Sequence, residues 1–396
     1  MSQPNTSPSF ETITLAEKLL AEVFGGMVRL DEGDDLGGSN RTTVYRFKIL
    51  EGAGNVPASV IVKHVHSTSD AVYDPHTGTI PAWTFLNEWA SLQFLSQITA
   101  DEEPFGPKFY VGERTAGLLI MEDIGQGVRL DQVLLGDDPV IAEKALIDFA
   151  ALHGRMHALS IGKQSEFARI RDALGPSDLA DGYYHYDWFG PTLQHTAETA
   201  GIPIGRSVES ELELLKKSLL NPGPFLAFTQ GDSCPDNCLW VNSSMRLLDF
   251  EGGMFSHALK EGVYGRVPFP TCWCVYRMPQ HVPLRMEEAY RAELVKGCPE
   301  AADDRLFSQA VVEACAFWML DWYHEFPLAK LLEKDRTIVT STMRQRFLLR
   351  SEILARTTEE FGHLEAFGET VKVIATKLGE VWTPDEYAMP SYPAFR

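Results

Sequence analysis

An Asp, an Asn and a second Asp stand in this sequence at a spacing that phosphoryl transfer can use: Asp232, Asn237 and Asp249. In a D-x-x-x-x-N loop of this type, the Asp receives the proton of a substrate hydroxyl, and the Asn holds a magnesium ion that a later Asp also binds. The three residues therefore indicate transfer of a phosphoryl group to a hydroxyl. The alternative is a polar surface turn with incidental acids, because short matches to this pattern also arise by chance.

The chain between these residues predicts the element that positions them. Two short apolar runs, 238–241 and 245–248, flank Asn242-Ser243-Ser244, which is typical of an antiparallel hairpin with a three-residue turn. If the turn is symmetric, positions 237 and 249 face each other with Cβ atoms about 4.5–5.5 Å apart. We therefore expect Asn237 and Asp249 to share one small hard cation.

The N-terminal part of the chain predicts strands joined by a turn that can approach phosphate groups. We expect one helix and three strands before residue 66, over 14–24, 28–30, 43–50 and 59–65. A turn over 31–41 joins the first two strands and contains Gly37, Gly38, Ser39 and Asn40. Because glycine lacks a Cβ atom, its backbone N–H can approach phosphate oxygens closely.

The aliphatic run Val60-Ile61-Val62 is followed directly by a charged residue, Lys63, at the end of the same expected strand. Burial of a Lys there costs free energy unless an anion pairs with it. The residues over 83–98 repeat apolar side chains every three or four positions, which predicts an amphipathic helix with Glu88 near its buried stripe. We expect Glu88 to pair with Lys63. The alternatives are an edge-strand Lys that deters aggregation and a solvated Glu.

Leu118-Leu119-Ile120-Met121 is an apolar strand that ends abruptly in Glu122-Asp123. The edge of such a strand offers backbone N–H and C=O groups to an adenine ring, and its end is a natural junction between two lobes. We therefore expect Met121, Glu122 and Asp123 at a nucleotide site, with a hinge at about 121–125. Helical periodicity dominates the chain after this point.

His153 and His157 stand one turn apart in a helix expected over 140–159. Such a pair can bind a metal in the pattern H-E-x-x-H, but Gly154 replaces the Glu here. We therefore expect the two imidazoles to make structural hydrogen bonds.

Length and composition indicate a large enzyme rather than a small module. The chain has 396 residues, of which 44% are hydrophobic and 11% aromatic, so it can bury a large core and two domains are expected. The polar N-terminus lacks the features of a signal peptide, and no run is long enough to span a bilayer, so we expect a soluble cytoplasmic protein. The net charge of -20 argues against nucleic acid and anionic membranes as partners, and it would attract a cationic small substrate.

The six cysteines are too few for a disulfide framework in a chain of this size, and we expect buried free thiols. Zinc held by Cys234, Cys238, Cys272 and Cys274 is the alternative, although these spacings differ from the usual C-x2-C pairs.

Taken in order, these features resemble the aminoglycoside phosphotransferase and choline kinase family of small-molecule kinases. The resemblance covers roughly residues 30–260 and is carried by Gly37-Gly38-Ser39-Asn40, Lys63, Glu88, Met121-Glu122-Asp123, Leu152-His153, Gly231-Asp232-x4-Asn237 and Asp249-Phe250-Glu251. It implies a two-lobed, protein-kinase-like α+β fold, in which a small N-terminal lobe with an antiparallel sheet and one helix precedes a larger, mainly helical lobe. The lobes would be 1–121, which binds the nucleotide, and 122–396, which binds the substrate and performs catalysis.

The same resemblance implies a role for each matched residue. Asp232 would be the catalytic base, and Asn237 and Asp249 would bind magnesium. Lys63 would hold the phosphates of ATP, or of GTP, and Glu88 would orient Lys63.

Three departures from the family pattern indicate which branch of the family the chain resembles. Gln230 replaces the His that usually precedes Gly-Asp, where we expect it to support the loop, and Asp236 adds a carboxylate beside Asn237. Phe250-Glu251, the third departure, replaces the Phe-Gly of protein kinases. In addition, an A-P-E ending is missing, and these points favour a small substrate over a protein.

The hypothesis is an ATP-dependent, magnesium-requiring phosphotransferase that acts on a hydroxyl of a small molecule, such as an aminoglycoside-like antibiotic or an amino alcohol. The alternative is a pseudokinase that binds nucleotide as a regulatory module. The acceptor stays open, as do ATP versus GTP and the oligomeric state. Candidate acceptor contacts are the aromatic runs 183–189, 269–274 and 317–323, together with Asp321 and Glu325.

Overall fold

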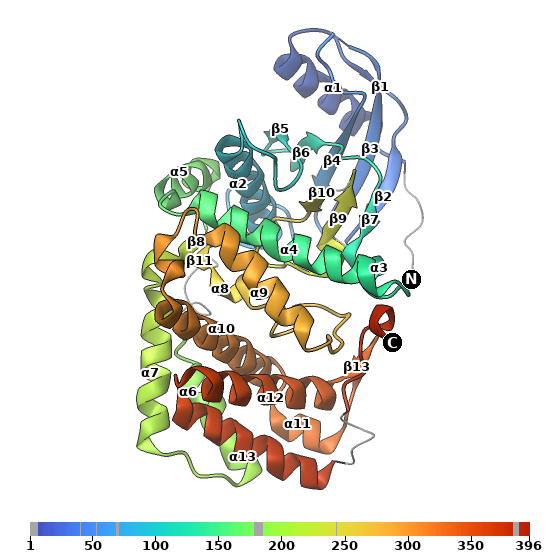
Figure 1. Ribbon diagram of the computed structural model, residues 1–396. Coiled ribbons are helices and arrows are strands. Elements are labelled where there is room, and N and C mark those ends of the chain that lie inside the picture. The colour runs from blue at the N-terminus through green and yellow to red at the C-terminus, as the bar shows by residue number, and fades with distance from the viewer. Residues whose placement is uncertain are drawn as a thin grey trace. The chain divides into compact units, whose positions relative to one another are not determined.

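The computed structural model describes residues 7–39, 41–52, 54–68, 71–177, 185–242, 244–382 and 388–396. The chain divides into two compact units, neither of which is continuous in sequence. Unit 1 comprises Met1–Gly127, Ser165–Ala180 and Arg246–Met254, and unit 2 comprises Val128–Gln164, Asp181–Met245 and Phe255–Arg396. Figure 1 shows the order of the elements along the chain. A functional division between 1–121 and 122–396 stays a prediction.

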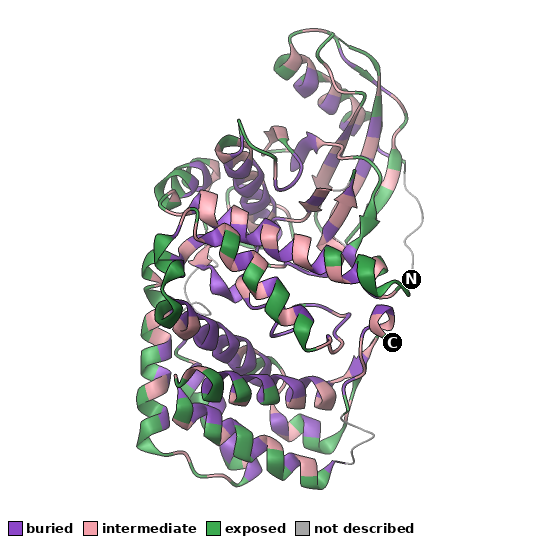
Figure 2. Cartoon of the chain, in the orientation of Figure 1, coloured by how far each residue is buried: buried purple, intermediate pink, exposed green. Residues whose placement is uncertain are grey.

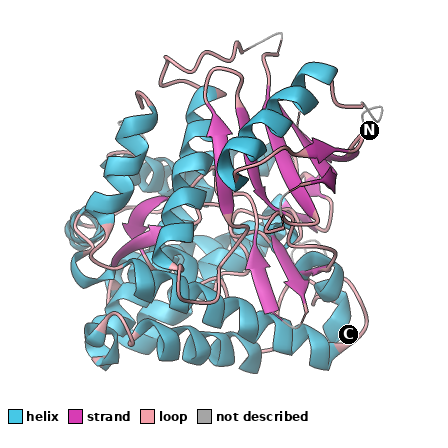
Figure 3. Cartoon of the chain, turned by 90° about the horizontal axis from the view of Figure 1, so that it is seen from above, coloured by secondary structure: helices cyan, strands magenta, loops and turns pink. Residues whose placement is uncertain are grey.

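Unit 1 is built on an antiparallel sheet, as the sequence predicts. Its strands are β1 (Arg29–Leu30), β2 (Asp34–Gly38), β3 (Thr42–Glu51), β4 (Ser59–Val65), β5 (Phe109–Glu113) and β6 (Leu118–Glu122). The order across the sheet is β1-β3-β4-β6-β5, and β2 pairs with β3. Figure 3 shows these strands side by side. The expected strands 43–50 and 59–65 agree with β3 and β4 to within one residue.

Three helices accompany the sheet: α1 (Phe10–Phe24), α2 (Ala82–Ile98) and α5 (Gln164–Leu174), of which α5 begins one residue before its unit 1 segment. The buried side of α1 packs with alternate residues of β3 and β4, and the cluster includes Leu19, Leu20, Phe47, Val60 and Val62. Because side chains alternate along a strand, Ile61 and Lys63 point to the opposite face from Val60 and Val62. The sheet thus separates its aliphatic core from the face that bears Lys63.

Unit 2 is mainly helical, which confirms the expected fold class. Its helices are α3 (Leu130–Leu134), α4 (Pro139–Ser160), α6 (Phe189–Ala200), α7 (Arg206–Leu220), α8 (Leu259–Gly262), α9 (His281–Leu294), α10 (Asp304–Glu325), α11 (Leu328–Glu333), α12 (Met343–Phe361) and α13 (Glu365–Val381). Its short 3-10 segments are η2 (Gly223–Phe225), η3 (Pro235–Asn237), η4 (Pro299–Ala302) and η5 (Pro393–Phe395). Two short strands near its end, β12 (Thr337–Ile338) and β13 (Ser341–Thr342), pair with each other.

The other short strands frame the loop that carries Asp232. They are β7 (Val128–Arg129), β8 (Leu226–Thr229), β9 (Cys238–Val241), β10 (Ser244–Leu247) and β11 (Met254–His257). β10, β9 and β7 form one sheet, and β11 and β8 form another. The division between the units falls inside β10 and again after Met254.

Helix α10 is the buried centre of unit 2. Every residue from Ala310 to Leu320 is buried, and Figure 2 shows the middle of this helix in the colour of buried residues. A helix that is apolar on all sides must be surrounded by other elements or by lipid. Within the described ranges, no helix combines the length and apolarity needed to cross a membrane.

Gly154 shows why the His153-Gly154-x-x-His157 segment carries a glycine. A Cβ atom at this position would lie 2.3 Å from the carbonyl oxygen of Tyr290 on α9. Helices α4 and α9 therefore approach more closely here than any side chain permits.

Gly154→Ala is expected to lower the free energy of unfolding by about 1–3 kcal/mol, because the added methyl group overpacks this crossing. Urea unfolding followed by circular dichroism measures the change. Gly190→Ala is the matched control, because a Cβ atom at this helical position meets no atom within 4 Å. It should leave stability unchanged or raise it by up to about 1 kcal/mol. Equal stability of the two variants would contradict the close packing of α4 on α9.

Candidate active site

Lys63 lies at the centre of the candidate site in unit 1. In the sheet it is paired with Val44 of β3 and Leu119 of β6. Its Nζ atom lies 2.6 Å from Oε2 of Glu88 and 3.0 Å from Oδ1 of Asp249. The expected pairing of Lys63 with Glu88 is therefore present, and Asp249 joins the same ammonium group.

Acids outnumber bases around this ammonium group. Glu251 is electrostatically coupled to Glu88, and its Oε1 atom lies 3.9 Å from Nη2 of Arg41. Burial raises the pKa of the Glu88 carboxyl to about 7, although Lys63 lowers it, and Asp249 acts in the same direction as burial. Burial lowers the pKa of Lys63, but the two carboxylates outweigh this effect and hold it above its ordinary value. Lys63 is thus cationic, and carboxylates remain in excess around it.

The backbone beyond Asp249 is held by α2. The Asn87 amide donates 2.8 Å hydrogen bonds to the carbonyl oxygens of both Glu251 and Gly253. The Phe250 ring is fully buried, and a Cβ atom at Gly106 would lie 2.6 Å from it. Sequence reasoning missed Asn87, whose only signal was its position beside Glu88 on the expected helix.

The glycine segment differs from the expected turn. Gly37 and Gly38 belong to strand β2, at an irregularity in its pairing with β3, and the chain turns after them. Gly38 has a φ of 147°, and a Cβ atom there would lie 2.0 Å from the carbonyl oxygen of Thr42. The turn begins at Ser39, whose N–H donates to Thr42 O over 2.9 Å. Asn40 lies outside the described residues, and contact of this segment with phosphates stays a prediction.

The acids at the end of β6 are already engaged within unit 1. Asp123 accepts two hydrogen bonds from the Arg46 guanidinium, at 2.8 and 2.9 Å, and one from Ser59 Oγ at 2.7 Å. Burial would raise the pKa of Asp123, but these bonds together with one from Gly125 N–H lower it. Glu122 accepts a bond from Lys108 N–H. The Asp123 side chain therefore fixes the end of β6, and contact of residues 121–123 with a nucleotide stays a prediction.

Asp232 and Asn237 come together in unit 2, as their spacing predicts. After β8, Gly231 adopts a φ of 90°, which suits glycine, and the chain then enters η3. The Asn237 amide donates to the backbone oxygen of Asp232 at 3.0 Å and approaches its Oδ2 atom at 3.4 Å. The local loop thus brings the proposed base and the proposed metal ligand into one hydrogen-bonded group.

A layer of buried polar residues holds this loop. His153 bonds to Ser233 Oγ through Nε2 and to Phe149 O through Nδ1, each at 2.9 Å. His157 bonds to Glu261 at 3.0 Å and to the Tyr290 hydroxyl at 2.8 Å. The expectation that the two histidines make structural hydrogen bonds is confirmed.

Glu261 completes this layer, and sequence reasoning missed it. Its Oε1 atom accepts the Gly231 N–H at 2.8 Å. Burial would raise the pKa of the Glu261 carboxyl, but its bonds with His157 and Gly231 and the charges of the two histidines hold it below the ordinary value. The signal that could have found it is that a buried histidine pair needs a buried acid. Gln230, the departure from the family pattern, is also buried and hydrogen-bonds His153.

The hairpin after Asn237 is one residue tighter than predicted. β9 ends at Val241 and β10 begins at Ser244, so two residues connect them instead of three. Asn242 has a φ of 50°, a left-handed conformation that tight hairpin turns use, and Ser243 lies outside the described residues. The expected facing pair of 237 and 249 is therefore wrong, because both positions lie outside the paired strands. Asp249 itself has a φ of 57°, which interrupts extended backbone.

The aromatic runs proposed for the acceptor are mostly core. Phe317, Trp318, Trp322 and Tyr323 are buried on α10, while residues 183–184 lie outside the described residues. Asp321 raises the pKa of two buried cations, Lys260 and Arg350, against the lowering caused by burial. Glu325 is exposed. Asp321 therefore has cations near it already and gives little support to a cationic acceptor.

Several solved structures of small-molecule kinases are similar to this chain. Choline kinase from Cryptosporidium parvum aligns with 11% identity and a TM-score of 0.47, over 93% of this chain and 98% of that one. A thermostable mutant of the aminoglycoside phosphotransferase APH(4)-Ia, in complex with ADP and hygromycin B, aligns with 13% identity and a TM-score of 0.40, over 92% of this chain and 98% of that one. The complex of APH(2")-IIa with streptomycin and ATP aligns with 11% identity and a TM-score of 0.43, over 83% of this chain and 97% of that one. These are the two groups of enzymes that the sequence motifs resemble.

No protein-family model matches the sequence, and no curated protein matches it.

The raised pKa of Glu88 predicts a pH dependence of stability. The unfolded chain loses this proton near pH 4.5, whereas the folded chain keeps it up to about pH 7. The free energy of unfolding therefore falls as the pH rises through this window, by up to about 3 kcal/mol for a shift of this size.

Glu88→Gln cannot titrate, so the stability of the wild type relative to this variant is expected to decrease between pH 4.5 and 7. Urea unfolding of both proteins at half-unit steps of pH measures this difference. The exposed Glu102 provides the control, because Glu102→Gln should show no such trend. A difference that stays constant or grows with pH would refute the effect of burial on Glu88.

Proposed function

We propose that this protein is an ATP-dependent, magnesium-requiring phosphotransferase that acts on a hydroxyl group of a small molecule. The observation that carries the proposal is the bonding of Lys63 to both Glu88 and Asp249. A buried ammonium held by one carboxylate from a helix, and placed beside a second carboxylate, can bind phosphate oxygens next to a metal ion.

The charges around Lys63 support this reading. Glu88 is nearly fully buried, whereas the Asp249 and Glu251 side chains keep about two fifths of their surface exposed. Glu88 thus fits an orienting role, and the accessible acids fit a divalent cation bound through oxygen. We assign Lys63 to the nucleotide phosphates, Gly37 to Asn40 to backbone contacts with them, and Met121 to Asp123 to the base.

Asp232 and Asn237 supply the second half of the chemistry. We assign Asp232 to receive the proton of the acceptor hydroxyl as its oxygen bonds to the γ-phosphorus and the nucleoside diphosphate leaves. Asn237 and Asp249 are the proposed magnesium ligands. When bound, magnesium neutralises the charge of the phosphate oxygens. The network of Ser233, His153 and Glu261 fixes the loop, so Asp232 needs little reorganisation.

A pseudokinase is the second candidate. Such proteins most often lose one of the four chemical groups, whereas Lys63, Asp232, Asn237 and Asp249 are all present here. Their presence favours turnover over binding alone. Asp321 beside two buried cations leaves the charge of the acceptor open.

Asp232→Asn is expected to reduce turnover by about 10²–10⁴-fold, because it removes the proton acceptor while keeping the shape of the side chain. Nucleotide consumption against a library of hydroxyl-bearing metabolites and antibiotics measures turnover, and calorimetry measures nucleotide binding, which should persist. Asp304→Asn is the control, since Asp304 is exposed and belongs to the same unit. Full activity of Asp232→Asn with the acceptor found by the screen would sink the assignment. If the wild type binds nucleotide but consumes none with any acceptor, the result would favour a pseudokinase over a phosphotransferase.

Asp249→Asn is expected to remove the effect of magnesium on nucleotide affinity. In the wild type, magnesium should tighten ATP binding on the order of tenfold or more, equivalent to about 1.4 kcal/mol. Titration calorimetry with and without magnesium measures this gain, with Asp101→Asn as an exposed control in unit 1. An unchanged gain in Asp249→Asn would exclude Asp249 as a ligand.

A further inference from the structure

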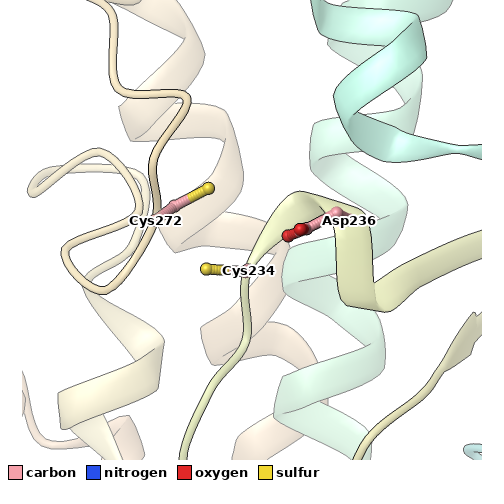
Figure 4. Close-up of side chains that lie close together, drawn as sticks. All are labelled: Cys234, Asp236 and Cys272. Atoms are coloured by element: carbon pink, nitrogen blue, oxygen red, sulfur yellow. The ribbon is translucent and has the colours of Figure 1, made fainter. Parts of the chain in front are cut away.

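Two cysteines and an aspartate converge beside the loop that carries Asp232. Figure 4 shows the Cys234 and Cys272 sulfur atoms and the Asp236 carboxylate close together. The three ligand atoms all lie within 4.8 Å of one another. Cys234 and Asp236 belong to the segment at η3, and Cys272 comes from the chain between α8 and α9.

The Asp236 carboxylate provides an independent sign of a missing ligand. Its Oδ2 atom accepts a hydrogen bond from Trp273 Nε1 at 3.0 Å. Its Oδ1 atom is buried, and no described residue gives it a hydrogen bond. A buried carboxylate oxygen without a partner costs free energy, so a cation at this position would remove the cost.

The surroundings suit a metal site. The indole N–H fixes the orientation of the carboxylate, which is how outer partners position metal ligands. Cys272 accepts the Cys274 N–H at 3.3 Å, and the Cys274 sulfur lies 3.1 Å from the Cys272 sulfur. The fully buried guanidinium of Arg346 bonds to the carbonyl oxygens of Cys272 and Trp273, at 2.8 and 2.6 Å. The cysteine segment is therefore held in place, with a positive charge nearby to offset thiolates.

We propose that Cys234, Asp236 and Cys272 form a zinc site, with Cys274 or a water molecule as the fourth ligand. Two sulfur ligands favour a borderline-soft ion such as Zn²⁺ over Mg²⁺ or Ca²⁺, which prefer oxygen. Tetrahedral ligands at about 2.0–2.3 Å from zinc lie roughly 3.3–3.8 Å apart, so the three atoms need to move only a little. On binding, each thiol releases its proton to solvent.

The donor set differs from the four-thiolate alternative that the sequence offered. The Cys238 sulfur faces the carbonyl oxygen of Cys234, at 3.4 Å, and Asp236 takes its place among the ligands. Zinc would tie residues 234–236 to residue 272 and so hold the backbone between Asp232 and Asn237.

Metal titration of the full chain tests this site without any measurement of phosphotransfer. Under a phosphine reductant, the metal-free wild type is expected to bind one Co²⁺ with thiolate-to-cobalt charge-transfer absorption, and one Zn²⁺ should displace it. Cys234→Ser and Cys272→Ser should each weaken the charge-transfer band, and Asp236→Asn should lower Zn²⁺ affinity by at least about tenfold. Trp273→Phe should lower it by about 10–100-fold, because the carboxylate loses its orienting bond.

Cys298→Ser and Cys315→Ser are the matched controls, since both thiols are buried in unit 2 outside this cluster and should leave binding unchanged. Melting of each metal-free variant shows whether it folds. Zn²⁺ should also raise the melting temperature of the wild type, but not of Asp236→Asn. Hydrogen exchange should show slower exchange over 231–238 when Zn²⁺ is added.

A wild type that binds Co²⁺ without thiolate absorption would overturn the proposal, as would equal Zn²⁺ affinity in the wild type and a folded Cys234→Ser or Cys272→Ser variant. Either result would leave a thiol hydrogen-bond network as the explanation of the cluster. Neither result depends on whether the protein transfers phosphate.

Discussion

Unit 1 depends on the buried ammonium group of Lys63. It joins three segments far apart in sequence: strand β4, helix α2 through Glu88, and the segment after β10 through Asp249. Removal of Lys63 would leave the buried Glu88 carboxylate without its cation, and a loss of this kind costs about 3–5 kcal/mol in a buried ion pair. Lys63 therefore ties Asp249 to the sheet even though this residue follows β6 by more than a hundred positions. Stability and the proposed nucleotide chemistry use the same ion pairs.

In unit 2, the position of the Asp232 loop depends on a hydrogen bond from one backbone N–H group, that of Gly231. The Gly231 N–H donates to one oxygen of the Glu261 carboxylate, and His157 bonds to the other oxygen. The Tyr290 hydroxyl in turn bonds to the second ring nitrogen of His157. A side chain at 231 would strain the left-handed backbone, and loss of the acid would leave a buried donor without a partner. Asp232 is thus positioned by residues that do no chemistry themselves. The close crossing of α4 and α9 at Gly154 brings Tyr290 to this network.

The sequence predicts best where one local pattern determines the structure. Apolar periodicity places α2 within one residue of its start, so Glu88 falls on the face that meets Lys63. The five-residue spacing of Asp232 and Asn237 closes within a single loop and needs no distant element. Asn87 was missed because its partners are backbone groups at positions 251 and 253, and Glu261 was missed because its partners, His157 and the Gly231 N–H, lie far from it in sequence. The predicted register of the β9–β10 hairpin was wrong by one residue, because Asn242 adopts a left-handed φ and the turn is shorter than predicted.

The oxygen donors around Lys63 and the sulfur donors around Cys234 belong to different units of the chain, and their chemistry differs. Asp249 and Glu251 offer only carboxylate oxygen beside an ammonium group, whereas Cys234 and Cys272 offer sulfur beside one carboxylate. Soft thiolates hold zinc far better than magnesium, and hard oxygens accept magnesium together with phosphate. A chain that needs both ions must prevent zinc from replacing magnesium, because zinc binds most oxygen sites more tightly. Preferred donors for each ion, sulfur in unit 2 for zinc and oxygen in unit 1 for magnesium, would serve this purpose. Asp236 would then bind zinc, whereas its neighbour Asn237 would bind magnesium.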